Sequence, residues 1–488
     1  MKIKNVLLLV SITAVSSCST YWPSYWRKPT SINEKTSELL EKSQSILDRV
    51  TARDLTPESC SADLDSLIVY YSQAPASINI DAVKNQGQEI LDQSFEARMA
   101  LHSQLSSLPV ECKAKVKTLF VKMRMTEDYV GVHFYNDQQI SAESIKYQEE
   151  PVPVFEADKY HPYHVGAGID PKVKFEFRNG DIMITKGVSF ISSTISELAT
   201  PKSLFSHIVF VHVDSSTKVV TTIESYVGRG VSIFPIDEAL KNENARILIL
   251  RAKDADLASR AADYMYNKVV KLKSEGKVIL YDYNLDFSDN SHLSCEEVAY
   301  DSFKTVSKGA VILPEMESQI ELNDQKFLNR VGVKKGSMMV PTDMETDSRF
   351  DVVLDWTDYR VMRDSWRKDA LLGEMFRWIS DYKYRIHENM TTVAAKVIWS
   401  TRHIPGLWGM LSKVSGIPKD FTKDVPSLTI TTIASLKAIG NELLPVVTSA
   451  DQEFYASTGK WMTKEELSKT LDEYRKTNPK KLRKVFRP

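Results

Sequence analysis

The chain has 488 residues, 42% of them apolar and 26% charged, which are ordinary globular values. This length allows roughly two to four domains and a large core, so a miniprotein stapled by disulfides is excluded. The 63 Lys and Arg balance 64 Asp and Glu to a formal net charge of -1, which excludes a whole-chain basic footprint for nucleic acid.

The N-terminus has the pattern of an export signal. Lys2 and Lys4 precede an apolar run over residues 6–15, which is too short for a permanent membrane span. Residues 1–17 are therefore expected to be a signal peptide. No later stretch reaches about 18 uninterrupted apolar residues, so the remainder is expected to be soluble.

The run ends in Val15-Ser16-Ser17-Cys18, which resembles a bacterial lipobox. That resemblance implies cleavage before Cys18 and lipidation of its thiol, and Ser19 in place of Asp implies the outer membrane, facing the periplasm. Several lipid chains on one Cys would anchor the chain without other help. Residues 18–30 would then be a lipidated linker. The alternative is a plain secretory signal with an incidental Cys.

Four regions follow that differ in composition and in the spacing of their apolar residues. Residues 31–147 have apolar residues at helical spacing and predict a helical domain. A linker with Pro and acidic residues, 148–171, leads to short β-branched runs alternating with helices, which predict an α+β domain over 172–360. Residues 361–488 return to helical spacing and end in a basic tail, expected to be a solvated terminus or to touch anionic lipid or cell-wall polymer.

Two cysteines of the helical domain, Cys60 and Cys112, are candidates for a disulfide. Export places them in an oxidising compartment, and the bridge would close a loop of about 50 residues, a stabilisation of roughly 4 kcal/mol on the chain-entropy model. Two buried free thiols are the alternative.

A hairpin is expected between His207 and Glu224. If a four-residue turn pairs Val213 with Lys218, the two residues lie directly opposite on one sheet face, with Cβ atoms about 4.5–5.5 Å apart. The carboxylate can then accept the imidazole N–H, fix the ring tautomer and stabilise the imidazolium, as the third member of a catalytic triad does. His212 is an odd number of positions away, so it points to the other face and is expected to be structural.

Cys295 is expected at the N-terminus of a helix over residues 295–306. Ser294 suits the cap, and Glu296 and Glu297 suit the first turn. The helix N-terminus and a nearby imidazolium both lower a thiol pKa, which is what a nucleophile needs, although the two glutamates oppose this effect. The alternative is a buried structural Cys.

These motifs resemble circularly permuted NlpC-like hydrolases of the papain fold, of the YiiX/YebB/YaeF type, because the His strand precedes the Cys helix. The resemblance covers about residues 176–355, and nothing comparable is found for either flank. The matching pieces, in chain order, are Gly180-Asp181-Ile182-Met183-Ile184, Ser206-His207-Ile208-Val209-Phe210, Glu224, Val231 to Leu240, Tyr281-Asp282-Tyr283 and Ser294-Cys295-Glu296-Glu297-Val298. The resemblance implies a permuted papain-like domain, with an antiparallel sheet and packed helices, between helical N- and C-terminal regions.

The resemblance also implies roles: Cys295 as nucleophile, His207 as base and Glu224 as the third polar residue. The backbone N–H of Cys295 is the natural oxyanion donor, and Tyr281 or Tyr283 could add a hydroxyl. The family often has Tyr-Cys-Ser-Glu at the start of this helix, which this chain lacks. No metal and no cofactor are expected.

The sequence therefore favours a cysteine hydrolase, peptidase- or amidase-like, in the bacterial cell envelope, cleaving an amide of peptidoglycan stem peptides through an acyl-enzyme. The first alternative is a lipid acyl hydrolase or acyltransferase with the same thioester chemistry, and the second is a non-catalytic envelope scaffold. The expected partners are the membrane, through lipidated Cys18, and a peptidoglycan or lipid substrate, but not nucleic acid. The sequence leaves the oligomeric state open.

Overall fold

The computed structural model describes residues 57–137, 162–166, 169, 175–404 and 421–487, apart from single residues or pairs at 242, 286, 288, 323, 332 and 388–389, with four isolated residues between 41 and 48. The expected signal peptide, Cys18, the lipidated linker and most of the 148–171 linker lie outside the described residues.

The centre of the fold is a seven-stranded sheet in the order β1-β10-β7-β2-β4-β5-β6, with every neighbouring pair antiparallel. Its strands are β1 Tyr163–Val165, β2 Ile182–Gly187, β4 His207–Val213, β5 Val220–Tyr226, β6 Gly230–Pro235, β7 Asn244–Ala252 and β10 Phe350–Thr357. The smaller sheets pair β3 Ala199–Thr200, β8 Ser318–Ile320 and β9 Gly336–Met338, and β11 Arg385–Ile386 with β12 Phe486–Arg487. Together with the helical flanks, these sheets confirm the α+β class.

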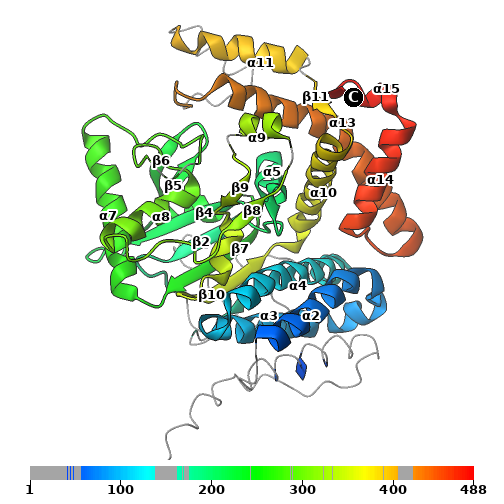
Figure 1. Cartoon of the computed structure of the whole chain (residues 1–488), viewed down its shortest axis with the longest axis horizontal. Coiled ribbons are helices and arrows are strands. Elements are labelled where there is room, and N and C mark those ends of the chain that lie inside the picture. Colours follow the sequence, from blue (N-terminus) through cyan, green and yellow to red (C-terminus); the bar gives the residue numbers. More distant parts are fainter. Residues whose placement is uncertain are drawn as a thin grey trace, which may run out of the picture.

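Side chains of the sheet alternate between two apolar layers. Ile208 and Phe210 of β4 join the layer formed with α7 Ala255–Ser274 and α8 Cys295–Val306 (Figure 1). Val209 and Val211 join the opposite layer, with α6 Ile236–Lys241. This alternation decides on which side of the sheet each candidate site residue lies.

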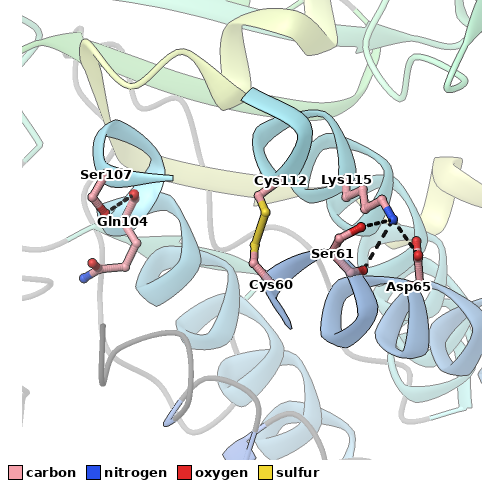
Figure 2. The surroundings of a disulfide bond; sticks show 7 residues. All are labelled: Cys60, Ser61, Asp65, Gln104, Ser107, Cys112 and Lys115. Carbon is pink, nitrogen blue, oxygen red and sulfur yellow. Dashed lines mark hydrogen bonds and ion pairs between the residues drawn. A yellow bond between two sulfur atoms is a disulfide. The ribbon is translucent and has the colours of Figure 1, made fainter. Parts of the chain in front are cut away.

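The N-terminal helices pack directly on the sheet. They are α2 Pro57–Ser77, α3 Ile80–Gln104, the short η1 Leu105–Ser107 and α4 Val110–Asp137. A disulfide joins Cys60 of α2 to Cys112 of α4, with Cα atoms 6.3 Å apart (Figure 2). Beside it, Lys115 donates to Ser61 and pairs with Asp65 at 2.5 Å, so two kinds of link hold α2 against α4 (Figure 2).

A buried cluster of charges joins these helices to strand β10. Arg98 Nη2 lies 2.7 Å from Asp355 Oδ2, and its Nε lies 2.9 Å from Glu127 Oε1. Arg124 Nη2 pairs with Glu345 at 2.6 Å and with Asp355 at 2.9 Å. Both arginines have side chains only 1% exposed, so each charge depends on its partners instead of water.

The C-terminal region begins with α10 Tyr359–Asp381 and forms a second apolar core with α13 Ser427–Thr458 and α14 Lys464–Thr477. The remaining helices are α5 Phe190–Leu198, α9 Gln325–Val331, η3 Pro341–Thr346, α11 Met390–Ser400, η4 Thr401–His403 and α15 Pro479–Leu482. Among the described helices, α13 alone is long and apolar enough to cross a membrane. In the structure, 50% of its most apolar window is buried.

The basic tail differs from the expected solvated terminus. Leu482, Val485 and Phe486 are buried in the second core, and β12 pairs with β11. The lysines and arginines between these apolar residues stay exposed. The expectation was wrong because it weighed only the charges and overlooked the apolar residues among them.

We predict that Arg98→Met lowers the free energy of unfolding by about 3–5 kcal/mol, because it leaves buried carboxylates without their counter-charge. Urea denaturation would measure this loss. The control is Arg260→Met, which removes an exposed ion pair with Asp256 on α7 and should cost less than about 1 kcal/mol. Equal losses in the two variants would show that the buried cluster does not hold the helices to the sheet.

Candidate active site

His207 and Glu224 form a hydrogen-bonded pair at the end of the β4–β5 hairpin. Nε2 of His207 lies 2.9 Å from Oε2 of Glu224. The carboxylate is 1% exposed and also accepts from the hydroxyls of Thr222 and Tyr226, each at 2.5 Å. The ring of Tyr226 stacks on the imidazole with centroids 4.9 Å apart. The pair is therefore held in one orientation from several sides.

The register of this hairpin differs by two residues from the sequence prediction. Val213 pairs with Val220 instead of Lys218, so continuing the register places Tyr226, not Glu224, opposite His207. Glu224 is the diagonal neighbour on the same face, since a shift of two preserves the face. The expectation failed because the Asp214 side chain accepts from backbone N–H groups of Ser216 and Thr217, which moves the turn one residue along the chain.

The electrostatics of Glu224 favour its charged form. Burial alone would raise its pKa, but the hydrogen bond and charge of His207 and the hydroxyls of Thr222 and Tyr226 bring the pKa of Glu224 below its usual value. An ionised carboxylate on Nε2 fixes the ring tautomer, which leaves Nδ1 as the nitrogen available for proton transfer.

Cys295 is the first residue of α8, as the sequence predicted. The backbone N–H of Ser294 donates to Oε2 of Glu297 at 2.7 Å, which closes one side of a capping box. The Cys is only 4% exposed. A helix N-terminus favours a thiolate, so the local backbone suits a nucleophile.

The immediate surroundings of the sulfur instead raise the pKa of the thiol. Sγ of Cys295 donates to Oε2 of Glu296 at 3.1 Å. Burial, and then the negative charge of Glu296, raise the pKa of Cys295 well above its usual value, and the backbone N–H of Ile208 opposes this only in part. The hydrogen bond to Glu296 and the raised pKa both favour the protonated thiol over the thiolate.

The start of α8 is inserted where β4 and β5 part. The pairing of these strands ends at Phe210 and Ile223. Two residues further along, the N–H of Ile208 meets the sulfur of Cys295 instead of β5, and Ser225 of β5 donates to the carbonyl of Leu293 at 2.5 Å. The sulfur thus lies beside the backbone of the residue that follows His207.

The structure brings together two of the three predicted residues. The His207 ring shares its sheet face with Val209 and lines a polar pocket with Glu224 and Tyr226, whereas α8 packs on the opposite face. Within the described part of the chain, no hydrogen bond joins Cys295 Sγ to His207. The assignment of the complete trio therefore stays a prediction.

Of the two candidate oxyanion tyrosines, Tyr281 lies close to Cys295. Tyr281 and Tyr283 have ring centroids 5.0 Å apart. Burial, and then the nearby Cys295 and Glu296, raise the pKa of the Tyr281 hydroxyl well above its usual value, so it remains a neutral donor. The Tyr283 hydroxyl accepts from the N–H of Gly228 at 3.1 Å. Tyr281 is therefore better placed than Tyr283 to donate a hydrogen bond to an oxyanion at Cys295.

Other polar residues have structural partners. His212 stacks on Tyr266 with centroids 3.9 Å apart and lies 3.3 Å from Asp263, on the face away from His207. Gly228 and Gly230 take positive φ values, 83° and 70°, at the turn between β5 and β6. Of the described residues, no group of three or more His, Cys, Asp or Glu could hold a metal ion.

Sequence reasoning missed Thr222 and Tyr226, and it did not distinguish Glu296, which contacts the thiol, from Glu297. Thr222, Glu224 and Tyr226 alternate along β5 with a period of two, so they share one face, and that spacing was a readable signal. Glu296 carried no such signal, because which residue of the first helical turn faces the sulfur depends on packing.

We predict that Glu296→Gln makes Cys295 more reactive, because the variant loses the negative charge that raises the thiol pKa. At neutral pH the alkylation rate with iodoacetamide should rise about tenfold for each unit by which the pKa falls. The pH dependence of alkylation measures the shift, and Glu321→Gln, an exposed residue, is the control. An unchanged profile in Glu296→Gln would contradict the interpretation.

Glu297 predicts a pH dependence of stability, because burial raises its pKa to about 7, with a contribution from Asp282. A carboxyl group that binds its proton more tightly in the folded state stabilises at low pH, and this stabilisation is lost as the pH rises towards about 7. Glu297→Gln keeps an oxygen acceptor for Ser294 but does not titrate. Denaturant unfolding at several pH values should show a smaller loss in the variant, and equal losses would refute the assignment.

The chain was compared with protein-family models, curated proteins and solved structures, and none of them matches. The resemblance to permuted NlpC-like hydrolases thus depends on the motif residues alone. The functional argument depends on the geometry of His207, Glu224 and Cys295.

Proposed function

We propose that the chain is a thiol-dependent acyl hydrolase, with Cys295 as nucleophile, His207 as general base and Glu224 as the residue that orients His207. The supporting observation is that the sulfur lies on the amide of Ile208, directly after a histidine whose Nε2 is bound by a buried carboxylate. In a permuted papain-like domain these roles would be those of the family that the motifs resemble.

The arrangement corresponds to a resting state. In the first step Cys295 turns from Glu296 towards His207, past the N–H of Ile208 on which its sulfur lies. Nδ1 is the ring nitrogen nearer to the backbone of His207. It makes no hydrogen bond within the described residues. A side-chain rotation at Cys295, with adjustment of the His207 ring, is the motion that the proposal requires.

The chemistry that follows is balanced without a cofactor. His207 takes the thiol proton as Sγ attacks the acyl carbon, and the carbonyl becomes an oxyanion near the N–H of Cys295 and the hydroxyl of Tyr281. The C–N or C–O bond breaks as His207 returns the proton to the leaving group. Water, deprotonated by His207, then cleaves the thioester, which releases the acid and restores the thiol.

Two substrate classes fit this chemistry. The NlpC-like motifs and the expected envelope location favour an amide of peptidoglycan stem peptides. An apolar cavity beside Glu296 and Tyr281 favours a lipid acyl group. The expected export and lipidation of Cys18 would place the enzyme at the outer membrane, facing the periplasm, where both substrates occur.

The test compares wild type with Cys295→Ala, His207→Ala and Glu224→Gln on purified sacculi and on phospholipid vesicles. We expect the first two variants to lose activity and Glu224→Gln to lose at least about a hundredfold, because the ring tautomer is no longer fixed. His212→Ala is the matched control, since this histidine of the same strand faces the other layer. It should retain activity.

An electrophilic thiol probe separates an enzyme from a scaffold. Labelling of Cys295 that depends on His207 supports catalysis. Labelling no faster than that of an unfolded thiol, together with no turnover of either substrate, would contradict the hydrolase and support the non-catalytic scaffold.

A further inference from the structure

The cavity beside Cys295 has an apolar wall built from distant parts of the chain. Its volume is about 110 Å³, and it is partly open to solvent. Its aliphatic lining comes mainly from α5, from β8 and β9, and from the start of α13, with further residues from the turn after β5 and from the segment that precedes α8. The lining residues are Ile191, Ile195, Leu198, Val227, Leu285, Ile320, Val333, Met338, Val340, Ile433 and Leu436. Such a surface is suited to a hydrocarbon chain and not to a sugar or a charged peptide.

Some polar residues of the lining lie beside Cys295. Tyr281, Asp282 and Glu296 are among its lining residues, and Glu296 is the carboxylate that holds the Cys295 thiol. A chain lying along the aliphatic wall would therefore bring its polar end to the first turn of α8.

We propose that this cavity binds the acyl chain of an uncharged acyl ester or amide and presents its carbonyl to Cys295. The placement of the carbonyl rests on the function proposed above. Attack would form the C–S bond of a thioester, the leaving alcohol or amine would receive the thiol proton through His207, and water would release the fatty acid.

The acidic residues of the lining disfavour a carboxylate next to Cys295. The lining contains two acidic residues, Asp282 and Glu296, and one basic residue, Arg330. Glu296 is the one that contacts the Cys295 thiol. A carboxylate placed near Cys295 would be repelled by the negative charge of Glu296, but a neutral ester carbonyl would not. The same repulsion favours departure of the anionic fatty acid after hydrolysis.

Binding is tested on full-length Cys295→Ala protein, which cannot turn over, by titration calorimetry with monopalmitoylglycerol, palmitate and a muramoyl peptide. We expect monopalmitoylglycerol to bind with a negative heat-capacity change and at least about tenfold more tightly than palmitate. Phosphatidylglycerol vesicles, added in a separate arm, show whether the chain is taken from a membrane or from free monomer.

The variant Ile433→Trp fills the cavity and should weaken acyl binding at least about tenfold, whereas Ile433→Leu should retain it. Val270→Trp on α7, where Val270 is 44% exposed, is the matched control for an added aromatic surface. Thermal unfolding of each variant verifies folding. Absence of binding, or binding that Ile433→Trp leaves unchanged, would overturn the proposed acyl site.

Binding and catalysis fail separately in this design. Acyl binding that depends on Ile433, without fatty-acid release by the wild type, would keep the cavity assignment and remove the proposed hydrolase. Release of muropeptides by a chain that does not bind the acyl ester would keep the thiol hydrolase and overturn the acyl cavity.

Discussion

The buried cluster of Arg98, Arg124, Glu127, Glu345 and Asp355 is the interaction on which the arrangement of the whole chain depends. Two guanidinium groups and three carboxylates lie within the interior, where an unpaired charge is costly. Burial acts against the charge of Asp355, but Arg124 and Arg98 hold its pKa below the usual range. Since β10 leads through β7 and β2 to β4, the cluster ties the N-terminal helices to the sheet that carries His207.

The sequence predicted those features that depend on residues close together in the chain. Helix α8 begins and ends at the predicted residues, because Ser294 and the glutamates after Cys295 form a local start signal. Strand β4 begins at His207 and ends at Val213, where the sequence predicted the turn. The predicted β4–β5 register was wrong by two residues. The side chain of Asp214 stabilises a turn that β-propensity alone does not determine. Glu224 still reached His207, since both stayed on one face.

The features that the sequence did not predict join residues far apart in the chain. Arg98 and Asp355 are 257 positions apart, and no local pattern marks them as partners. The acyl cavity has the same character, because its wall combines α5, β8, β9 and α13. Single aliphatic residues on these elements look like ordinary core residues until packing leaves a space between them. Tertiary packing also decides that Glu296, and not Glu297, receives the thiol hydrogen bond.

The C-terminal region has a direct influence on the candidate site. Thr422 donates to the carbonyl of Gly228 at 2.6 Å, and the N–H of Gly228 in turn donates to Tyr283. Tyr283 packs against the small core of Trp399, Val425 and Ile430. Thr429, Thr432, Ile433 and Leu436 of α13 supply one side of the apolar cavity. A fragment containing only residues 172–360 would keep His207, Glu224 and Cys295 but lose this wall. If the proposed chemistry holds, the catalytic groups lie within residues 172–360, whereas groups that select the substrate come in part from α13. Residues 172–360 alone would then form a hydrolase without its full specificity.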